Sequence, residues 1–257
     1  MGKRGWIGVT IVGLLALVML APFLYMVSLS LSDASGTEAY REALLAVPFG
    51  RFFFNSVVLA GGAAVGQVLT SAAAAYALAR LRFPGRDRVF LAFLSILMMP
   101  AVVLLVPRYL IINALGWVDS YAGLISTELV SVWGIFFLRQ YFLTLPRDLE
   151  DAARLDGAGE WTIFRRVILP QATPALATLG LVAFADQWKS FLWPLVATRS
   201  PEMSVMEVGL ARFHTLYPAN WPLQMAAAVI ATLPLLIVFF AAQRYINRGV
   251  PLADSRS

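Results

Sequence analysis

The 257-residue chain lacks cysteine, has a single histidine and carries few charged side chains. The absence of cysteine excludes thiol catalysis, disulfides and cysteine-ligated metals. Lysine occurs only as Lys3 and Lys189, and neither stands in the G-x-x-x-x-G-K-[ST] pattern of a nucleotide-hydrolysing loop. The lone His214 has no cluster of metal ligands beside it, and the chain has no G-x-S-x-G motif. We therefore expect no catalytic site, no metal site and no cofactor bound by this chain.

The sequence is rich instead in apolar stretches long enough to cross a membrane. Hydrophobic residues make up 60% of the chain and charged residues 14%, with a mean hydropathy of +0.74. A soluble domain has about 25% charged residues, and a membrane-spanning helix needs about 20 apolar ones. The sequence thus predicts an all-α polytopic membrane protein with one transmembrane domain over 1–257 and six helices near 6–31, 54–79, 88–112, 121–142, 173–197 and 222–246.

Positive charge is distributed unevenly between the connecting segments. Fourteen Lys and Arg residues fall at the N-terminal end, in the second and fourth connections and in the tail, against five in the other connections. Because Lys and Arg are retained on the cytoplasmic side, both termini are predicted to be cytoplasmic. The net charge of +5 then reflects topology rather than nucleic-acid binding. Lys3-Arg4 could begin a cleaved signal peptide, but the apolar run that follows is longer than the about 7–15 residues of such peptides, which favours an uncleaved anchor.

Two of the predicted helices have unusual compositions. The second contains Gly62 and Gly66, four residues apart among many alanines, and this spacing lets helix backbones approach closely in lipid. The third contains Pro100 and Pro107, which remove backbone hydrogen bonds and permit a kink, in a moving gate or in a static bundle alike. The sequence therefore predicts close packing around the second helix and allows a bend in the third.

The fourth connection, residues 143–172, is polar and carries both charge signs, so it is more than a simple linker. Pro146 can start a helix with an acidic first turn, and Gly157 can end it. A second helix is predicted over 159–168, before Leu169-Pro170 breaks the chain. Two short helices joined at a glycine are compatible with an amphipathic hairpin on the membrane surface. They also predict a docking surface for a cytoplasmic partner.

The residue order of this loop resembles the EAA loop of ABC-transporter permeases, whose pattern is E-A-A, three residues, G, nine residues and I-x-L-P. Asp151-Ala152-Ala153 stands for the E-A-A, Gly157 for the glycine, and Val167-Ile168-Leu169-Pro170 closes the pattern. Asp for Glu and Val for Ile are departures from it. Asp156-Gly157-Ala158 adds the D-G-A usual in carbohydrate importers. The resemblance implies that residues 143–172, the coupling loop, place a coupling helix in a groove of an ATPase subunit.

Further segments resemble the second permease subunit of carbohydrate importers, the maltose-type inner-membrane partner; they are Ala75–Arg80, Phe83–Arg86, Pro100–Pro107 and Phe191–Leu195. The resemblance implies a type I ABC importer permease fold in a bacterial or archaeal cell membrane. It also implies a homologous second permease subunit, two cytoplasmic ATP-binding subunits that use ATP and magnesium, and an extracytoplasmic solute-binding protein, besides membrane lipid. Many relatives end in a basic segment where this chain has Gly249-Val250-Pro251, so tail contacts with the ATPase do not follow from the resemblance.

The coupling residues that the resemblance assigns lie at both ends of the loop. Its small alanines would let a helix seat deeply in a groove, and its charged residues would set the orientation of that helix. A rigid lever of this kind converts closure of the ATPase dimer into movement of the spans. The assigned residues are Glu150, Asp151, Ala152, Ala153, Asp156, Gly157, Ala158, Leu169 and Pro170.

Asp186, Lys189 and Glu128 lie well inside predicted spans, where an unpaired charge is costly. Asp186 and Lys189 are three residues apart and share a helix face, and Glu128 lies at a similar depth. One interpretation is a structural ion pair of Lys189 with either acid. In the other, Lys189 lines the translocation path and helps to select a polar or anionic solute, where carbohydrate permeases commonly have asparagine. The candidate path residues are Glu128, Asp186, Trp188, Lys189 and Phe191.

The predicted function is therefore that of a permease subunit in an ATP-driven ABC importer, which moves a sugar, oligosaccharide or related polyol derivative inward by alternating access. ATP hydrolysis is expected in a separate subunit, so the chain itself is not an enzyme. The alternative is a self-contained, ion-coupled secondary transporter that uses the intramembrane charges, although no inverted repeat is visible. A membrane enzyme would lack catalytic residues, and the loop pattern does not belong to exporters. Glycerol-3-phosphate importers share these motifs, so a phosphorylated substrate stays open.

Overall fold

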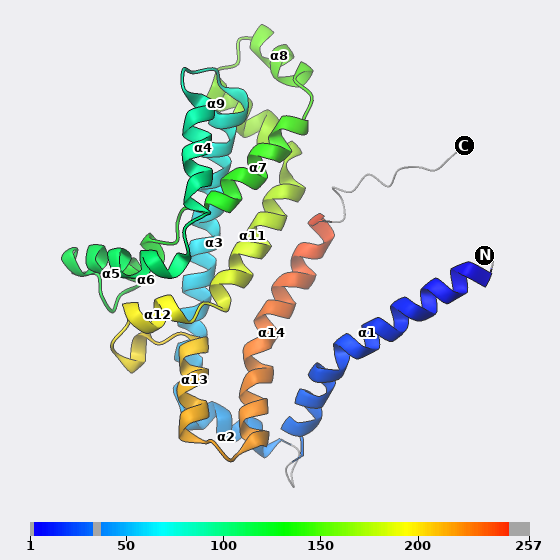
Figure 1. Cartoon of the computed structure of the whole chain (residues 1–257), viewed down its shortest axis with the longest axis vertical. Coiled ribbons are helices and arrows are strands. Elements are labelled where there is room, and N and C mark those ends of the chain that lie inside the picture. Colours follow the sequence, from blue (N-terminus) through cyan, green and yellow to red (C-terminus); the bar gives the residue numbers. More distant parts are fainter. Residues whose placement is uncertain (1–2, 33–36, 247–257) are drawn as a thin grey trace.

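The structure, a computed structural model, describes residues 3–32 and 37–246, with side chains from residue 9 to residue 243. All regular elements within these ranges are helices, which confirms the all-α prediction. The longer helices α3 (Phe49–Arg80), α7 (Val132–Thr144), α11 (Thr173–Trp188) and α14 (Trp221–Ile246) run side by side along the molecule (Figure 1). Helix α1 (Lys3–Ser30) meets α14 near one end of the bundle and then diverges from it (Figure 1). The departure noted at residues 249–251 lies outside the described residues.

Short helices lie at both ends of this bundle (Figure 1). One end carries the coupling loop, with α8 (Asp148–Leu155), α9 (Glu160–Ile163), the π-helix η2 (Phe164–Ile168) and α10 (Leu169–Gln171). The other end carries α2 (Glu38–Ala46), the 3-10 helix η3 (Pro201–Met203) and α13 (Met206–Leu216). The coupling loop and the connection before α14 are therefore at opposite ends of the molecule, as expected for opposite sides of a membrane.

Three of the predicted spans are interrupted rather than continuous. The third is divided into α4 (Arg86–Ile96), the 3-10 helix η1 (Ala101–Leu104) and α5 (Leu105–Ala114), with a bend of 95°. The fourth is divided into α6 (Tyr121–Ser126) and α7, and the fifth into α11 and α12 (Leu192–Ala197).

Local chemistry explains each interruption. Pro100 precedes η1 and lacks the backbone N–H that a continuous helix requires. Ser131 caps α7, because its hydroxyl accepts a hydrogen bond from the backbone N–H of Gly134 at 3.1 Å. Pro194 lies within α12, where a helix running on from α11 would bring its ring against the carbonyl of residue 190. The sequence allowed a bend in the third span, but continuous fourth and fifth helices were the wrong expectation.

Length and composition qualify three described helices as membrane spans, over Val9–Ser30, Phe49–Arg80 and Trp221–Gln243. Two bent pairs raise the number to five if each counts as one span: α4 with the segment Ala101–Ala114, and Glu160–Gln171 with α11. The count of six spans, and the single domain over 1–257, stay predictions.

The main core lies where α3, α7 and α11 meet the coupling loop. Ala72, Ala75 and Ala79 of α3 are at most 3% exposed and pack against buried side chains that include Phe142 and Ile168. Such small residues let the three helices approach closely.

The predicted close packing around the second helix is confirmed at both glycines. A Cβ at Gly62 would lie 3.0 Å from Cδ1 of Ile125, and one at Gly66 would collide with Leu129. Both contacts face the α6–α7 interruption, so the small residues of α3 hold the irregular segment 127–131 against the bundle.

The end of α3 opposite the coupling loop is fixed by a buried asparagine. The Asn55 side chain is fully buried, and its amide nitrogen donates to the carbonyls of Glu202 and Ser204, both at 2.8 Å. The amide oxygen accepts a hydrogen bond from the Tyr121 hydroxyl at 2.6 Å. Asn55 therefore ties α3 to the segment between α12 and α13 and to the start of α6.

A second tie at this end uses Asp119, the one non-glycine residue with positive φ among those described (φ 62°). Its carboxylate accepts hydrogen bonds from the backbone N–H groups of Arg199 at 2.9 Å and Ser200 at 3.1 Å. Burial would raise the pKa of Asp119, but these hydrogen bonds outweigh it and leave the pKa below its ordinary value. The carboxylate thus holds the turn before α6 against the end of α12.

Candidate functional site

The coupling loop forms the helix, glycine break and helix that its sequence predicts. Helix α8 has an acidic first turn and ends in left-handed Gly157, whose φ is +82°. The N–H of Gly157 donates to the Arg154 carbonyl and that of Ala158 to the Ala153 carbonyl. This pair of hydrogen bonds is the Schellman motif, and a residue with a Cβ is strained at the position of Gly157.

The second half of the loop differs in one respect from its prediction. Leu169-Pro170 does not break the chain, because the helix continues through α10 and bends only at Ala172, before α11. Pro170 lies where the π-helix η2 passes into α10, and the helix ends one residue later, at Gln171. The bend between the segment Glu160–Gln171 and α11 is 78°.

A buried ion pair fixes α8 to the end of α3. The Glu150 Oε1 and Arg80 Nε atoms are 3.0 Å apart, and each side chain is only 2% exposed. The two atoms are in ionic contact without hydrogen-bond alignment, since neither has a hydrogen-bond partner in the described structure. The guanidinium also donates to the carbonyls of Phe142 and Leu145. Glu150 therefore faces the bundle, although it was expected to orient the loop toward a partner.

Arg154 joins the two halves of the loop. Its guanidinium contacts Asp151 Oδ1 at 3.0 Å and Glu160 Oε1 at 3.1 Å, and it reaches Glu150 Oε2 at 3.5 Å. The hydrogen bonds that Arg154 donates to Glu160 raise the pKa of Arg154. Glu160 also accepts a hydrogen bond from the Tyr76 hydroxyl of α3 at 2.6 Å. Because all of these groups are linked to α3, the loop is positioned as a rigid element.

The outward side of the loop is mixed in character. Leu155 is 90% exposed and Trp161 is 70% exposed, and large apolar side chains this exposed mark interaction surfaces when they occur together among polar ones. Of the assigned coupling residues, Ala153, Ala158 and Leu169 are partly buried against the core. The exposed ones are Asp151, Ala152, Asp156, Gly157 and Pro170.

The charged residues of the predicted spans do not pair as expected. Glu128, in the α6–α7 interruption, forms an ion pair with Arg108 of α5 and accepts a hydrogen bond from Gln187 Nε2 at 2.8 Å. Arg108 also donates to the Thr127 hydroxyl and lies 4.1 Å above the Trp193 ring. The partner of Glu128 is thus Arg108, a residue of the third predicted span that was counted only toward the charge asymmetry.

The segment around Glu128 is held by polar side chains of α3. Gln67 donates to the Glu128 carbonyl at 2.9 Å and Thr70 to the Leu129 carbonyl at 2.7 Å. These hydrogen bonds satisfy carbonyls that the helix break leaves without helical partners, which lipid could not do. Polar side chains from the third, fourth and fifth predicted spans, all of which are interrupted, therefore meet at one place in the bundle.

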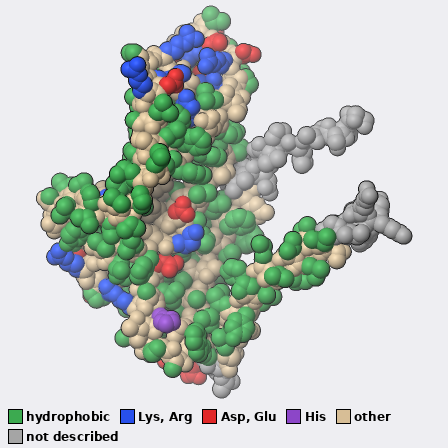
Figure 2. Space-filling view, viewed as in Figure 1, with side chains coloured by type: hydrophobic (Ala, Val, Ile, Leu, Met, Phe, Trp, Pro, Cys, Tyr) green, Lys and Arg blue, Asp and Glu red, His purple; other side chains and the backbone are tan. Residues whose placement is uncertain are grey.

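Lys189 lies at the end of α11 and is exposed, as is Asp186. Among the described residues, no ion pair joins Lys189 to Asp186 or Glu128, so the structural-pair interpretation is wrong in its stated form. Lys189 interacts electrostatically with Glu207 of α13, whose pKa is raised by burial and lowered in part by that lysine. Figure 2 shows acidic and basic side chains together at mid-height of this face, separate from the charged group at its upper end.

The two aromatic candidates differ. The Trp188 ring is 3% exposed, and its Nε1 donates to the Ala231 carbonyl of α14 at 3.0 Å. Phe191 is 40% exposed in the break between α11 and α12. Phe191 and Lys189 are thus exposed in this conformation, whereas Trp188 joins α11 to α14.

Sequence reasoning missed Arg80, Arg108 and Trp161. Both arginines were counted only as markers of topology, and their partners are distant in sequence. Trp161, an aromatic residue in a polar loop, was a visible signal that could have identified the docking surface.

Residues 67–251 match the family model described as "Binding-protein-dependent transport system inner membrane component". The arabinooligosaccharides transport system permease protein AraQ of Bacillus subtilis is 38% identical over 200 residues, 78% of this chain and 71% of the relative. The sn-glycerol-3-phosphate transport system permease protein UgpE of Brucella abortus is 35% identical over 222 residues, 83% of this chain and 79% of the relative.

A similar fold occurs in the crystal structure of a bacterial ABC transporter involved in the import of the acidic polysaccharide alginate. The TM-score is 0.82 with 24% sequence identity, and the match covers 95% of this chain and 98% of the other. The alginate transporter in complex with an alginate pentasaccharide-bound periplasmic protein matches with a TM-score of 0.73 and 18% identity, over 96% of each chain.

Proposed function

The chain belongs to the family of binding-protein-dependent transport system inner membrane components, and from this premise we propose how it works within an ATP-driven importer. It is a membrane permease subunit that moves a sugar, oligosaccharide or related polyol derivative inward by alternating access. The observation that carries the proposal is the rigid coupling loop, anchored by Arg80–Glu150 and exposing Leu155 and Trp161 at one end of the bundle.

The proposed assembly supplies what this chain lacks. Two cytoplasmic ATP-binding subunits hydrolyse ATP with magnesium, a homologous second permease completes the path, and an extracytoplasmic protein delivers the solute. Both termini are then cytoplasmic, as is the coupling loop. Closure of the ATP-binding subunits moves α8, and because α8 is fixed to α3 the movement passes to the bundle as a rigid-body change.

The ion-coupled alternative gains no support. A carboxylate that exchanges protons or cations during transport needs a free coordination site, whereas Glu128 is engaged by Arg108 and Gln187. The named relatives are permeases of transport systems for arabinooligosaccharides and sn-glycerol-3-phosphate.

Crosslinking through an introduced cysteine tests the docking surface, and the native chain adds no thiol background. In the complete importer in membranes, we expect Leu155→Cys to crosslink to the ATP-binding subunit, because this side chain is 90% exposed at the end of α8. Leu216→Cys, 64% exposed on α13 at the opposite end, is the matched control and should crosslink to the external protein or not at all. Equal capture of the ATP-binding subunit at both positions, or none at Leu155→Cys, contradicts the proposal.

Solute selection is tested at Lys189. If its ammonium group faces the path, Lys189→Asn should lower uptake of an anionic solute by about tenfold, the loss expected when a charge-assisted hydrogen bond is removed. Uptake of a neutral oligosaccharide should change little, and Lys189→Arg should retain most of the anion uptake. The measurement is uptake of neutral, acidic and phosphorylated sugars into proteoliposomes. Unchanged rates and preference in Lys189→Asn would remove this residue from the path.

A further inference from the structure

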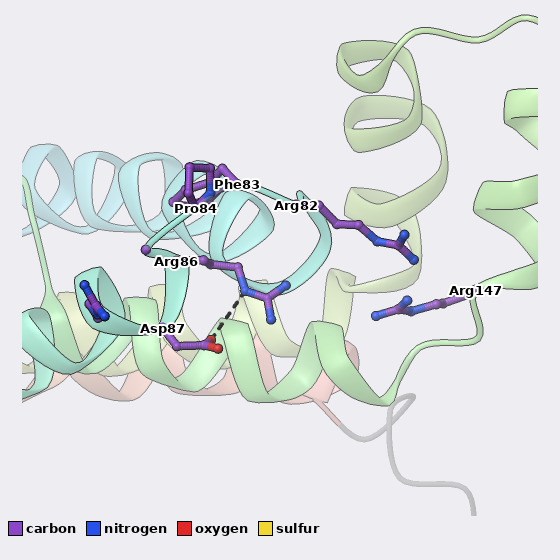
Figure 3. Close-up of a pocket in the computed structure, with 8 residues that line it drawn as sticks. Arg82, Phe83, Pro84, Arg86, Asp87 and Arg147 are labelled. Atoms are coloured by element: carbon purple, nitrogen blue, oxygen red, sulfur yellow. Dashed lines mark hydrogen bonds and ion pairs between the residues drawn. The ribbon is translucent and has the colours of Figure 1, made fainter.

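An arginine-lined pocket lies beside the coupling loop, at the connection between α3 and α4. It has a volume of about 730 Å³ and is lined by Arg82, Phe83, Pro84, Gly85, Arg86, Asp87, Arg88 and Arg147. Figure 3 shows the side chains of Arg82 and Arg147 pointing toward one another from the two sides of the pocket. Four arginines thus share this pocket with a single carboxylate.

The carboxylate does not neutralise the arginines that face each other. Asp87 is engaged by Arg86 at 3.4 Å and by Arg139 at 3.6 Å. Among the described residues, no carboxylate lies within 4.0 Å of Arg82, Arg88 or Arg147, and all three side chains are exposed. Like charges that converge in this way repel each other unless an anion joins them.

Exposed apolar side chains occur at the pocket and on α4, which begins at the pocket residue Arg86. Phe83 and Pro84 form an exposed tip at the pocket edge, with Phe83 39% exposed. On the helix that follows, Val89 is 44% and Leu91 63% exposed. A cationic pocket bordered by exposed apolar side chains matches an amphipathic ligand, since a soluble anion would contact the arginines alone.

We propose that this pocket binds the phosphate headgroup of an anionic phospholipid from the cytoplasmic leaflet, with the acyl chains along α4. Arginine forks bind phosphate in bidentate geometry, and basic pockets at this side of membrane proteins attract anionic headgroups. Only the cytoplasmic orientation of the pocket rests on the proposed function, not the solute or the mechanism. Arg147 immediately precedes α8, so a bound lipid would brace the start of the coupling helix.

The test uses the complete importer in nanodiscs of phosphatidylcholine with a quarter of phosphatidylglycerol. The amount of each lipid retained after extraction into detergent is measured by mass spectrometry. Each arginine near an anionic surface contributes about a fivefold change in affinity, so Arg82→Gln and Arg147→Gln should each reduce retained phosphatidylglycerol by about that factor. Phosphatidylcholine should be unaffected. Arg41→Gln, exposed on α2 at the opposite end, is the matched control and should retain phosphatidylglycerol as the native chain does.

Three outcomes would overturn the proposal. The first is unchanged phosphatidylglycerol retention in the double variant Arg82→Gln/Arg147→Gln. The second is loss of the ATP-binding subunit in that variant with lipid retention intact, which would make the pocket a protein contact. The third is complete displacement of phosphatidylglycerol by millimolar inorganic phosphate, which would make it a site for free anions. Crosslinking at Leu155→Cys is read separately, so failure here leaves the test of the coupling loop unaffected.

Discussion

Replacing Glu150 by alanine should destabilise the protein by about 3–5 kcal/mol, because it leaves the Arg80 guanidinium buried without its counter-charge. The same change frees α8 from α3. Solute-stimulated ATP hydrolysis should therefore fall by a larger factor than the amount of folded importer does. Thermal unfolding of the detergent-purified importer and its ATPase rate measure the two effects.

Asp148→Ala is the matched control for Glu150→Ala. Asp148 is an exposed acid in the same first turn of α8, and its loss should change stability by less than about 1 kcal/mol. The double variant Arg80→Met/Glu150→Met should recover part of the stability, but not all, since the carbonyls of Phe142 and Leu145 also lose their donor. Equal effects of Glu150→Ala and Asp148→Ala would show that the buried pair does not anchor the loop.

The second large effect is expected at Arg108. Arg108→Ala leaves Glu128 charged within an apolar bundle and removes the contact with the Trp193 ring. We expect a loss of about 3 kcal/mol or more and a transporter that no longer holds the α6–α7 interruption in place. Thermal unfolding in nanodiscs and uptake into proteoliposomes are the measurements.

Removing both charges separates the ion pair from simple packing. Arg108→Met/Glu128→Gln leaves no buried charge and should recover more than half of the stability that Arg108→Ala loses. Arg199→Ala is the control, since Arg199 is exposed and its side chain donates a hydrogen bond to the Tyr109 hydroxyl. If the double variant is as unstable as Arg108→Ala, the counter-charge is not what stabilises this region.

The sequence was sufficient for the features that are local in the chain. The glycine at 157 has a left-handed conformation that a particular helix ending requires, and the spacing of glycines in α3 determines how near its neighbours can come. Such patterns depend on residues a few positions apart. They therefore predicted the two-helix form of the coupling loop and the close packing of α3.

Pairings between distant residues were not predictable in this way. Arg80 and Glu150 are 70 positions apart, and nothing near either residue in the chain indicates the other. Arg108 falls within the third predicted span, but the sequence did not show that the break before η1 leaves α5 beside Glu128. The exposure of Lys189 likewise depends on where α11 ends, which Pro194 decides six residues beyond Trp188.

Helix α3 connects the two ends of the molecule as a single rod. With 32 residues it measures about 48 Å; its last residue is clamped to α8, and Asn55 near its start is clamped to the segment that precedes α13. A tilt imposed at either clamp must appear at the other, because an unbroken helix between them has no joint to absorb it. Solute delivery at one end and nucleotide binding at the other would then affect each other through the tilt of this one helix.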